Sequence, residues 1–338
     1  MKSLFPILSY LLIYDSKIEL IIWSPSIIIS IIYFIKNFLK ILKDKTLSAI
    51  IVLIFIAITI NPKLEYKELL RLIYSIGLYF LSKEKVMNGN NTKNQIILLL
   101  TAELILRIFN GDLNEITLYS IKGSGGIFAD SNFVGLLIVF AIIGLNNQKN
   151  KSNYDLISIY LYILLFLTFS RTAWIMLGTY LIGKKSISAS IVILAGSIIS
   201  PFIINYNEYD TQEVDGSMAT KIIIFKTFLH VLNSNLTDIL FGLGREIPAL
   251  ISEELEGSSY SGHTIFGQIV QYGLIINLLF YTTAYKLFRK ISDNANLIII
   301  ILLTGGFLGL SPTSYFGLIF VTYTIFKNNT YLINQKIH

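Results

Sequence analysis

The stretch NYNEYDTQEVDGSMATKIIIFKTFLHVLNSNLTDILFGLGREIPALISEELEGSSYS, residues 205–261, is the one long polar segment in an otherwise apolar sequence. It leads to His263, after which the apolar run IFGQIVQYGLIINLLFY begins almost at once. We interpret residues 205–263 as a long loop between two membrane helices. The loop carries Lys221, Lys226 and Arg245, and a histidine at its end would lie at a membrane surface facing them. The sequence therefore predicts half of an active site in this loop, supported by membrane spans.

Composition indicates a membrane protein. Hydrophobic residues make up 54% of the 338 residues and charged residues 14%, with a mean hydropathy of +0.65. Ordinary soluble domains have about 25% charged residues, so lipid is the expected solvent for this chain. The absence of cysteine excludes disulfides and cysteine-based metal sites or nucleophiles. The net charge of +6 does not indicate nucleic acid as a partner, because the lysines occur in short loops between apolar runs.

Apolar runs separated by charged residues predict an all-α fold, a polytopic membrane helical bundle of about twelve transmembrane helices in a single domain. The predicted spans are 3–14, 19–35, 47–60, 69–82, 95–109, 132–146, 155–170, 172–183, 187–204, 264–287, 297–311 and 314–327. Residues 155–183 and 297–326 are each too long for one span at ~1.5 Å rise per residue, and we interpret both as tight hairpins. Gly305, Gly306 and Ser311-Pro312 interrupt the second of these runs.

The distribution of lysine predicts the orientation of the spans. Positive charge collects on the cytoplasmic side of membrane proteins. With both termini in the cytoplasm, nearly every short Lys/Arg cluster falls in an inside loop. The outer side then receives residues 110–130 and the long loop.

Within the long loop, residues 219–236 show a helical apolar stripe, with Lys221, Lys226 and His230 on the polar face. This pattern is typical of an amphipathic helix lying on the membrane surface. Residues 247–255 predict a second short helix.

Two outward-facing positions before the long loop carry groups that suit an anion. The glycines in Lys122–Asn132 leave backbone N–H groups open to an anion. The alternative is an ordinary loop in which Asp130 or Ser131 caps the following helix. Arg171 lies inside an apolar stretch, where an arginine costs at least ~2.5 kcal/mol at mid-membrane. It either snorkels from a hairpin tip to the headgroups or binds a phosphate or diphosphate through its fork of donors.

The long loop provides the remaining candidates. Arg245 follows the turn-prone Phe241-Gly242-Leu243-Gly244. His263 is either a polar residue at a helix end or a proton acceptor near neutral pH. No outward-facing metal-ligand cluster has usable spacing, and the sequence has no P-loop or dinucleotide glycine motif, so we expect no metal and no cofactor.

Four of these features together resemble the O-antigen ligase and O-antigen polymerase superfamily. The segment from Gly126 to Asn132 resembles the family's glycine–phenylalanine–x–x–proline–asparagine motif, with Ser131 where proline is usual. Ser170-Arg171 resembles its Ser-Arg turn between two spans. The glycines in Leu240–Gly244 resemble its paired glycines, and His263 followed by Gly273-Leu274 resembles its histidine ahead of a glycine-leucine helix. Thr264 and Lys221 stand where the family commonly has asparagine and arginine.

The resemblance implies a metal-independent membrane glycosyltransferase with the polytopic fold of lipid-donor glycosyltransferases. Its donor would be an oligosaccharide on undecaprenyl diphosphate, and its acceptor a glycan hydroxyl. The enzyme would lie in the bacterial cytoplasmic (inner) membrane, with its site on the outer face and a chain-length regulator as a further partner. Arg171, Arg245, Lys221 and Lys226 would hold the diphosphate and glycan together with Asn132 and Asp130, and His263 would be the base.

The motifs leave two enzymes open. The chain is either a polymerase of O-antigen or capsular repeat units, or a ligase that transfers finished polysaccharide to lipid A-core. A flippase or other transporter of lipid-linked oligosaccharides is the alternative of a different class. It is disfavoured because no repeated halves are visible and the predicted spans are almost free of charge.

Overall fold

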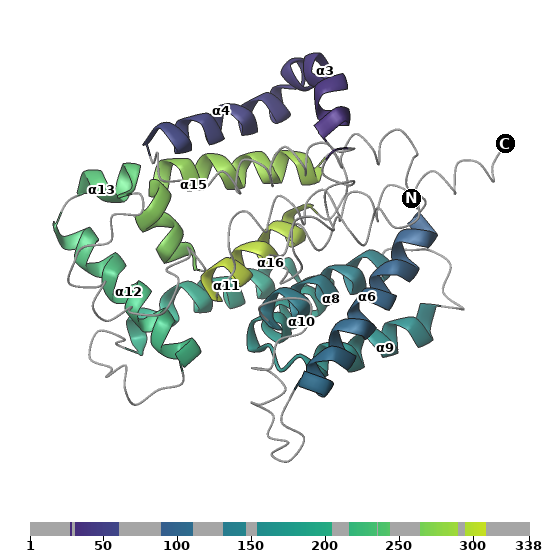
Figure 1. The fold of residues 1–338 in the computed structure, drawn as a ribbon. Coiled ribbons are helices and arrows are strands. Elements are labelled where there is room, and N and C mark those ends of the chain that lie inside the picture. The colour runs from purple at the N-terminus through teal and green to yellow at the C-terminus, as the bar shows by residue number, and fades with distance from the viewer. Residues whose placement is uncertain are drawn as a thin grey trace.

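The computed structural model describes residues 28, 31–60, 89–110, 131–146, 154–204, 216–234, 236–243, 264–289 and 295–308. Throughout these residues the regular secondary structure is helical, which confirms the all-α class (Figure 1). The helices are α3 (Phe38–Lys43), α4 (Lys45–Ile60), α6 (Gly89–Asn110), α8 (Ser131–Asn146), α9 (Tyr154–Leu167), α10 (Arg171–Gly183), α11 (Ile187–Ile203), α12 (Gly216–Ser234), α13 (Leu236–Phe241), α15 (Ile265–Arg289) and α16 (Ala295–Leu308).

Hydrophobic runs in the sequence locate most of these helices. The predicted spans 132–146 and 187–204 coincide with α8 and α11 to within one residue. The amphipathic stripe at 219–236 lies on α12. The predicted spans 3–14, 69–82 and 314–327, and the predicted short helix at 247–255, lie outside the described residues.

The predicted hairpin at 155–183 is confirmed as two helices with a short turn between them. Helix α9 ends at Leu167 and α10 begins at Arg171. Phe169 occupies the left-handed region with a φ of 48°, which only a tightly specified turn imposes on a bulky residue. The ring of Trp174 stacks on Phe166 with centroids 5.1 Å apart, and its Nε1 donates to the backbone oxygen of Leu165 at 3.2 Å. These contacts fix the turn after α9 and therefore the position of Arg171, the first residue of α10.

The first helix of the second predicted hairpin, the span 297–311, corresponds to α16, which ends at Leu308. Gly305 and Gly306 lie inside α16 and are buried, so they do not interrupt the helix. Because small residues allow helices to approach closely, they suit a helix that packs against α10, α11 and α15 at once. The rest of that hairpin lies outside the described residues.

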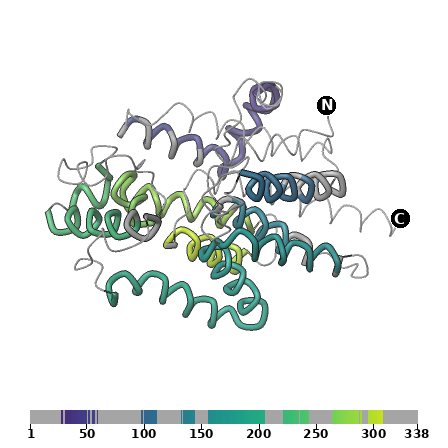
Figure 2. Tube along the Cα trace, turned by 60° about the horizontal axis from the view of Figure 1, so that its bottom comes forward, coloured from purple at the N-terminus to yellow at the C-terminus, as the bar shows by residue number. Residues whose placement is uncertain are grey.

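The helices form two groups that meet at α11, α15 and α16. Figure 2 shows α12 and α13 at one end of the molecule and α6, α8 and α9 at the other. Helix α8 contacts α9 and α10, and α16 contacts α10, α11 and α15. Helix α12 packs against α13 and α15.

The apolar face of α12 is buried against protein. Ile224, Phe225 and Phe228 form one core cluster with Ile265, Phe266 and Val270 of α15. The expectation that this amphipathic helix rests with its apolar face on the membrane is therefore wrong for these residues, because α15 covers them.

Helix α15 consists of two arms. The backbone of Gly273 leaves the helical region, with φ 80° and ψ 158°. Figure 1 shows the resulting bend, with the long arm alongside α4. We call residues 265–272 the short arm and residues 274–289 the long arm. The break positions the short arm between α12 and α16, next to the site described below.

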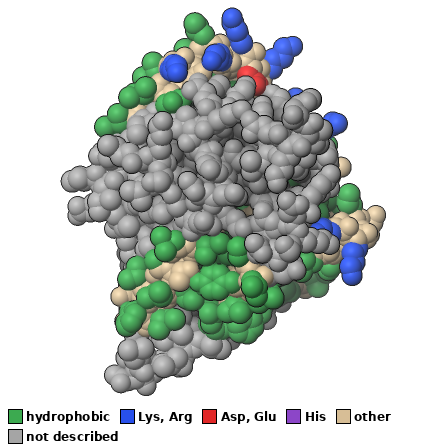
Figure 3. Space-filling view, turned by 90° about the vertical axis from the view of Figure 1, so that its right-hand side faces the viewer, with side chains coloured by type: hydrophobic (Ala, Val, Ile, Leu, Met, Phe, Trp, Pro, Cys, Tyr) green, Lys and Arg blue, Asp and Glu red, His purple; other side chains and the backbone are tan. Residues whose placement is uncertain are grey.

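The described helices differ in length and in apolar character. Residues Ile265–Lys286 of α15 are the one stretch there that is long and apolar enough to cross a membrane, and 56% of that window is buried. Shorter apolar helices include Leu156–Leu167 and Ile187–Ile203. Large side chains on both are exposed, including Leu156 at 79% and Ile203 at 77%. Figure 3 shows hydrophobic side chains gathered over the lower part of one face and along its upper left, with lysine and arginine at the top and along the right-hand edge.

Gly135 provides a test of the packing between α8 and α10. A Cβ at Gly135 would lie 2.6 Å from the Cβ of Ala173 and 3.1 Å from that of Ser170. Gly135→Ala should therefore destabilise the protein by about 1–3 kcal/mol, the usual cost of overpacking. Gly178→Ala in α10 is the matched control, because no atom lies within 4 Å of its added Cβ. It should leave the thermal midpoint unchanged or raise it, and equal losses in both variants would contradict this packing.

Candidate functional site

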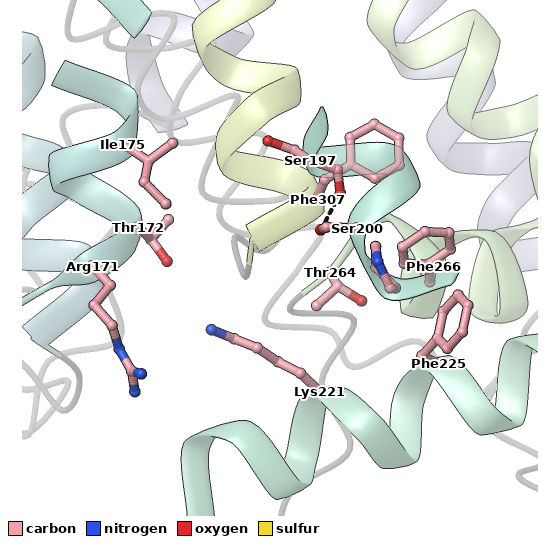
Figure 4. Close-up of a pocket in the computed structure, with 11 residues that line it drawn as sticks. Arg171, Thr172, Ile175, Ser197, Ser200, Lys221, Phe225, Thr264, Phe266 and Phe307 are labelled. Carbon is pink, nitrogen blue, oxygen red and sulfur yellow. Dashed lines mark hydrogen bonds between the residues drawn. The ribbon is translucent and has the colours of Figure 1, made fainter. Parts of the chain in front are cut away.

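A cavity of about 180 Å³ lies where α10, α11, α12, α15 and α16 meet (Figure 4). Its wall is formed by Arg171, Thr172, Ile175, Ser197, Ser200, Pro201, Lys221, Phe225, Thr264, Phe266 and Phe307. Pockets for drug-sized ligands are typically about 300–1,000 Å³. This cavity therefore fits a headgroup or part of a larger substrate.

Arg171 and Lys221 bring two positive charges to this cavity from different helices. Figure 4 shows both side chains extending into the space between α10 and α12. Arg171 is the first residue of α10, directly after the N-cap Ser170. A helix N-terminus already carries about half a positive charge, so an arginine there is electrostatically unfavourable unless an anion is near. Two cations and a helix N-terminus together make this end of the cavity suited to an anion.

Hydroxyl groups line the cavity between the cations and the aromatic rings. The Thr264 hydroxyl accepts from the backbone N–H of Gly267 at 3.2 Å, which leaves its O–H able to donate to a bound group. Ser197 and Ser200 donate to backbone oxygens of their own helix, Ile193 at 3.0 Å and Ser197 at 3.4 Å. Their lone pairs remain to accept from a ligand hydroxyl.

The opposite end of the cavity is aromatic. The rings of Phe225 and Phe266 are 5.1 Å apart edge to face, and those of Phe266 and Phe307 are 5.5 Å apart. The ring of Phe202, on α11, packs edge to face against that of Phe225, with the ring centroids 4.9 Å apart. The cavity thus has a cationic end and an apolar end, an arrangement that matches an amphiphile with an anionic head.

A partly buried side-chain hydrogen bond connects the Ser-Arg turn to α8. The Ser170 hydroxyl donates to Oδ1 of Asn132 at 2.8 Å and accepts from the backbone N–H of Ala173 at 3.3 Å. One side chain therefore caps α10 and joins two segments that are 38 residues apart. Asn132, predicted to bind substrate, positions the turn that carries Arg171 and does not line the cavity.

The structure brings together only part of the predicted site. Arg171 and Lys221 share the cavity, whereas Lys226 lies on α12 away from the wall. His263, Arg245 and Asp130 lie outside the described residues. Thr264, the residue after His263 in the chain, is buried on the wall.

Sequence reasoning missed the rest of the wall. Ser197 and Ser200 are one helical turn apart in an apolar span, and that spacing was the available signal for a polar face inside the bundle. The three phenylalanines come from three different helices, so nothing in the sequence connects them.

Sequence reasoning also overlooked a buried ion pair in α6. Arg107 Nε donates to Glu103 Oε1 at 2.6 Å, and the two side chains are 3% and 0% exposed. Both lie within the predicted span 95–109, so the expectation of spans almost free of charge is wrong for α6. The two charges are four residues apart on one helix and neutralise each other locally.

Within the described residues, no group of three or more His, Cys, Asp or Glu side chains could hold a metal ion. Comparisons of the chain with family models, curated proteins and solved structures found no match.

The double role of Ser170 predicts a larger loss on mutation than an ordinary cap. Ser186 is a matched control, because it caps α11 by accepting from Ala189 N–H at 3.3 Å and is exposed. Ser186→Ala should cost ~1 kcal/mol, the usual value for an N-cap. Ser170→Ala should cost about 1 kcal/mol more, because it also removes the partly buried hydrogen bond to Asn132. Thermal unfolding measures both, and equal losses would show that the Asn132 bond contributes nothing.

Proposed function

We propose that this chain is a metal-independent membrane glycosyltransferase that polymerises oligosaccharide repeat units carried on undecaprenyl diphosphate. The proposal rests on the cavity shared by Arg171, at the N-terminus of α10, and Lys221 of α12. A diphosphate is already a good leaving group, and fixed cations that stabilise its developing charge can replace a metal. The resemblance of the four sequence motifs supplies the substrate class.

The groups in the cavity allow roles to be assigned. Arg171 and Lys221 contact the diphosphate, and Thr264 donates a hydrogen bond to it or to the first sugar. Phe225, Phe266 and Phe307 contact the first isoprenoid unit of the carrier. The volume of about 180 Å³ leaves the remaining glycan outside the cavity.

In the transfer step, the acceptor hydroxyl oxygen attacks the anomeric carbon of the donor sugar. The bond from that carbon to the diphosphate oxygen breaks, and the lipid diphosphate leaves with both electrons. His263 takes the hydroxyl proton, and Arg245 completes the cationic side of the site. In this proposal about twelve spans cross the cytoplasmic membrane of a bacterium, and the cavity opens to the outer face.

A ligase acting on lipid A-core would use the same cavity, with a different acceptor. A deletion strain separates the two enzymes. Single repeat units on core indicate a lost polymerase, whereas long chains retained on the carrier indicate a lost ligase.

One observation favours a transporter of the same lipid-linked glycan. Broken helices such as α15 are typical of transporter binding sites. Vesicles that move the donor across the bilayer without forming a glycosidic bond would establish that function in place of transfer.

The two cations should be required for transfer. Purified enzyme supplied with carrier-linked repeat units should build a ladder of chains. Arg171→Ala and Lys221→Ala should each lower the rate by about 10²–10³-fold, the usual loss for one group that stabilises developing negative charge. Lys184→Ala is the control, because Lys184 lies at the other end of α10, with its Nζ 5.6 Å from the Tyr180 ring centre. Full ladders from both cavity variants would refute the assignment.

The base assignment has its own test. His263→Gln removes the proton acceptor, and general-base catalysis contributes typically about 10²–10⁴-fold. We expect a loss of that size in the transfer rate, with donor binding unchanged because the diphosphate contacts remain. A His263→Gln enzyme that still builds the full ladder would contradict the assignment of His263 as the base. Thr264 or another group would then contact the acceptor hydroxyl.

A further inference from the structure

Hydrogen bonds from Asn277 and Leu243 satisfy backbone carbonyl groups at the break in α15. Nδ2 of Asn277, on the long arm, donates to the backbone oxygens of Gly273 at 2.8 Å and Gln268 at 3.0 Å. The backbone N–H of Leu243, after α13, donates to the oxygen of Val270 at 2.8 Å. A helix that stops leaves its last carbonyl groups without intrahelical partners. Here Asn277 and Leu243 supply partners for two carbonyls of the short arm.

Two glycines make the break sterically possible. Gly242 and Gly273 both have positive φ, 85° and 80°, and their backbones are in contact. A Cβ on Gly242 would lie 2.6 Å from the backbone nitrogen of Gly273. A Cβ on Gly273 would overlap the backbone oxygen of Leu240. The atoms that an added Cβ would meet belong to the backbone, which cannot move aside as a flexible side chain can. Only glycine therefore fits at either position.

The short arm beyond this break forms one side of the cavity. Phe266 of the short arm, and Thr264 just before it, line the cavity. The short arm also forms the surface against which the apolar face of α12 packs. Lys221 lies one helical turn before Phe225, which is part of that packed face. The angle at Gly273 therefore sets where Lys221 stands relative to Arg171.

We propose that Asn277 is a positioning residue which, with the Gly242–Gly273 contact, holds the two arms of α15 at the angle that places Lys221 opposite Arg171. Asn277 touches no substrate in this account. It acts through the short arm and α12. The inference rests on the proposed function only in taking the cavity as the diphosphate site.

The absence of cysteine allows a direct measurement of the angle. Spin labels at Asn233→Cys on α12 and Thr282→Cys on the long arm report across the break, because both positions are exposed. Asn277→Leu keeps the size of the side chain and removes both donated bonds. It should broaden the label-to-label distance distribution or shift its centre. Asn277→Ser, which keeps one hydroxyl donor, should give a smaller change and covers the case in which Asn277→Leu does not fold.

Thr283→Val is the matched control. Thr283 is buried on the same arm, and its hydroxyl donates to the backbone oxygen of Leu279 at 2.8 Å, away from the break. This variant loses a buried polar group without touching the joint, so its distance distribution should match that of the unmodified chain. A distribution unchanged in both Asn277 variants would overturn the proposal.

Binding of inorganic diphosphate, measured by calorimetry, links the angle to the cavity. Asn277→Leu should weaken it by about tenfold, as for one misplaced charge-assisted contact, while Thr283→Val should leave it unchanged. If the enzyme transfers glycan, Asn277→Leu should also raise the donor KM and leave the acceptor KM unchanged. Unweakened diphosphate binding in Asn277→Leu would overturn the link. An unmodified protein that makes no ladder or binds no diphosphate would refute the proposed function. The distances between the spin labels would still show whether Asn277 holds the angle between the two arms of α15.

Discussion

The packing of α12 on the short arm of α15 determines the geometry of the cavity. Phe225 and Phe228 contact Phe266, so these rings hold α12, which carries Lys221, against the short arm, which directly follows Thr264. Aromatic pairs of this kind prefer specific edge-to-face or offset arrangements, so they fix orientation as well as bury area. On the facing side, α10, which carries Arg171, packs against α8 and α16. The cavity lies where these two groups of helices meet, with Phe307 of α16 also contacting Phe266 of the short arm.

Backbone polar groups explain why the short arm can exist at all. A helix that stops inside an apolar bundle leaves carbonyl groups that need hydrogen-bond partners from the protein. The chain meets this constraint with a side-chain amide from four residues further along α15 and with a backbone N–H from the loop after α13. The same logic applies at the other wall, where Ser170 caps α10 and also bonds Asn132. Both walls therefore depend on buried polar side chains that contact no ligand.

The positions of the charges give the cavity a preference for an anion with an apolar tail. The positive end of α10, Arg171 and Lys221 lie at one end, and phenylalanine rings lie at the other. Near apolar walls the effective dielectric constant is lower than in water, so each cation interacts more strongly with a bound anion. The Glu103–Arg107 pair is buried, and its two charges neutralise each other within α6. Arg171 is exposed at the start of α10 and lines the cavity.

The sequence by itself determined the helical class, the positions of α8 and α11, the turn before Arg171 and the helix that carries Lys221, because hydrophobic period and charge placement are local signals. It also marked Gly242 and Gly273 as separate motifs. Only the tertiary structure showed that these glycines touch, that Asn277 fills the break, and that three phenylalanines and two serines share a wall with both cations. Apart from the Asn277 bonds, which lie within α15, those contacts join residues that are far apart in the sequence. Their energies depend on how the helices pack in space, and no periodicity along a single chain records that packing.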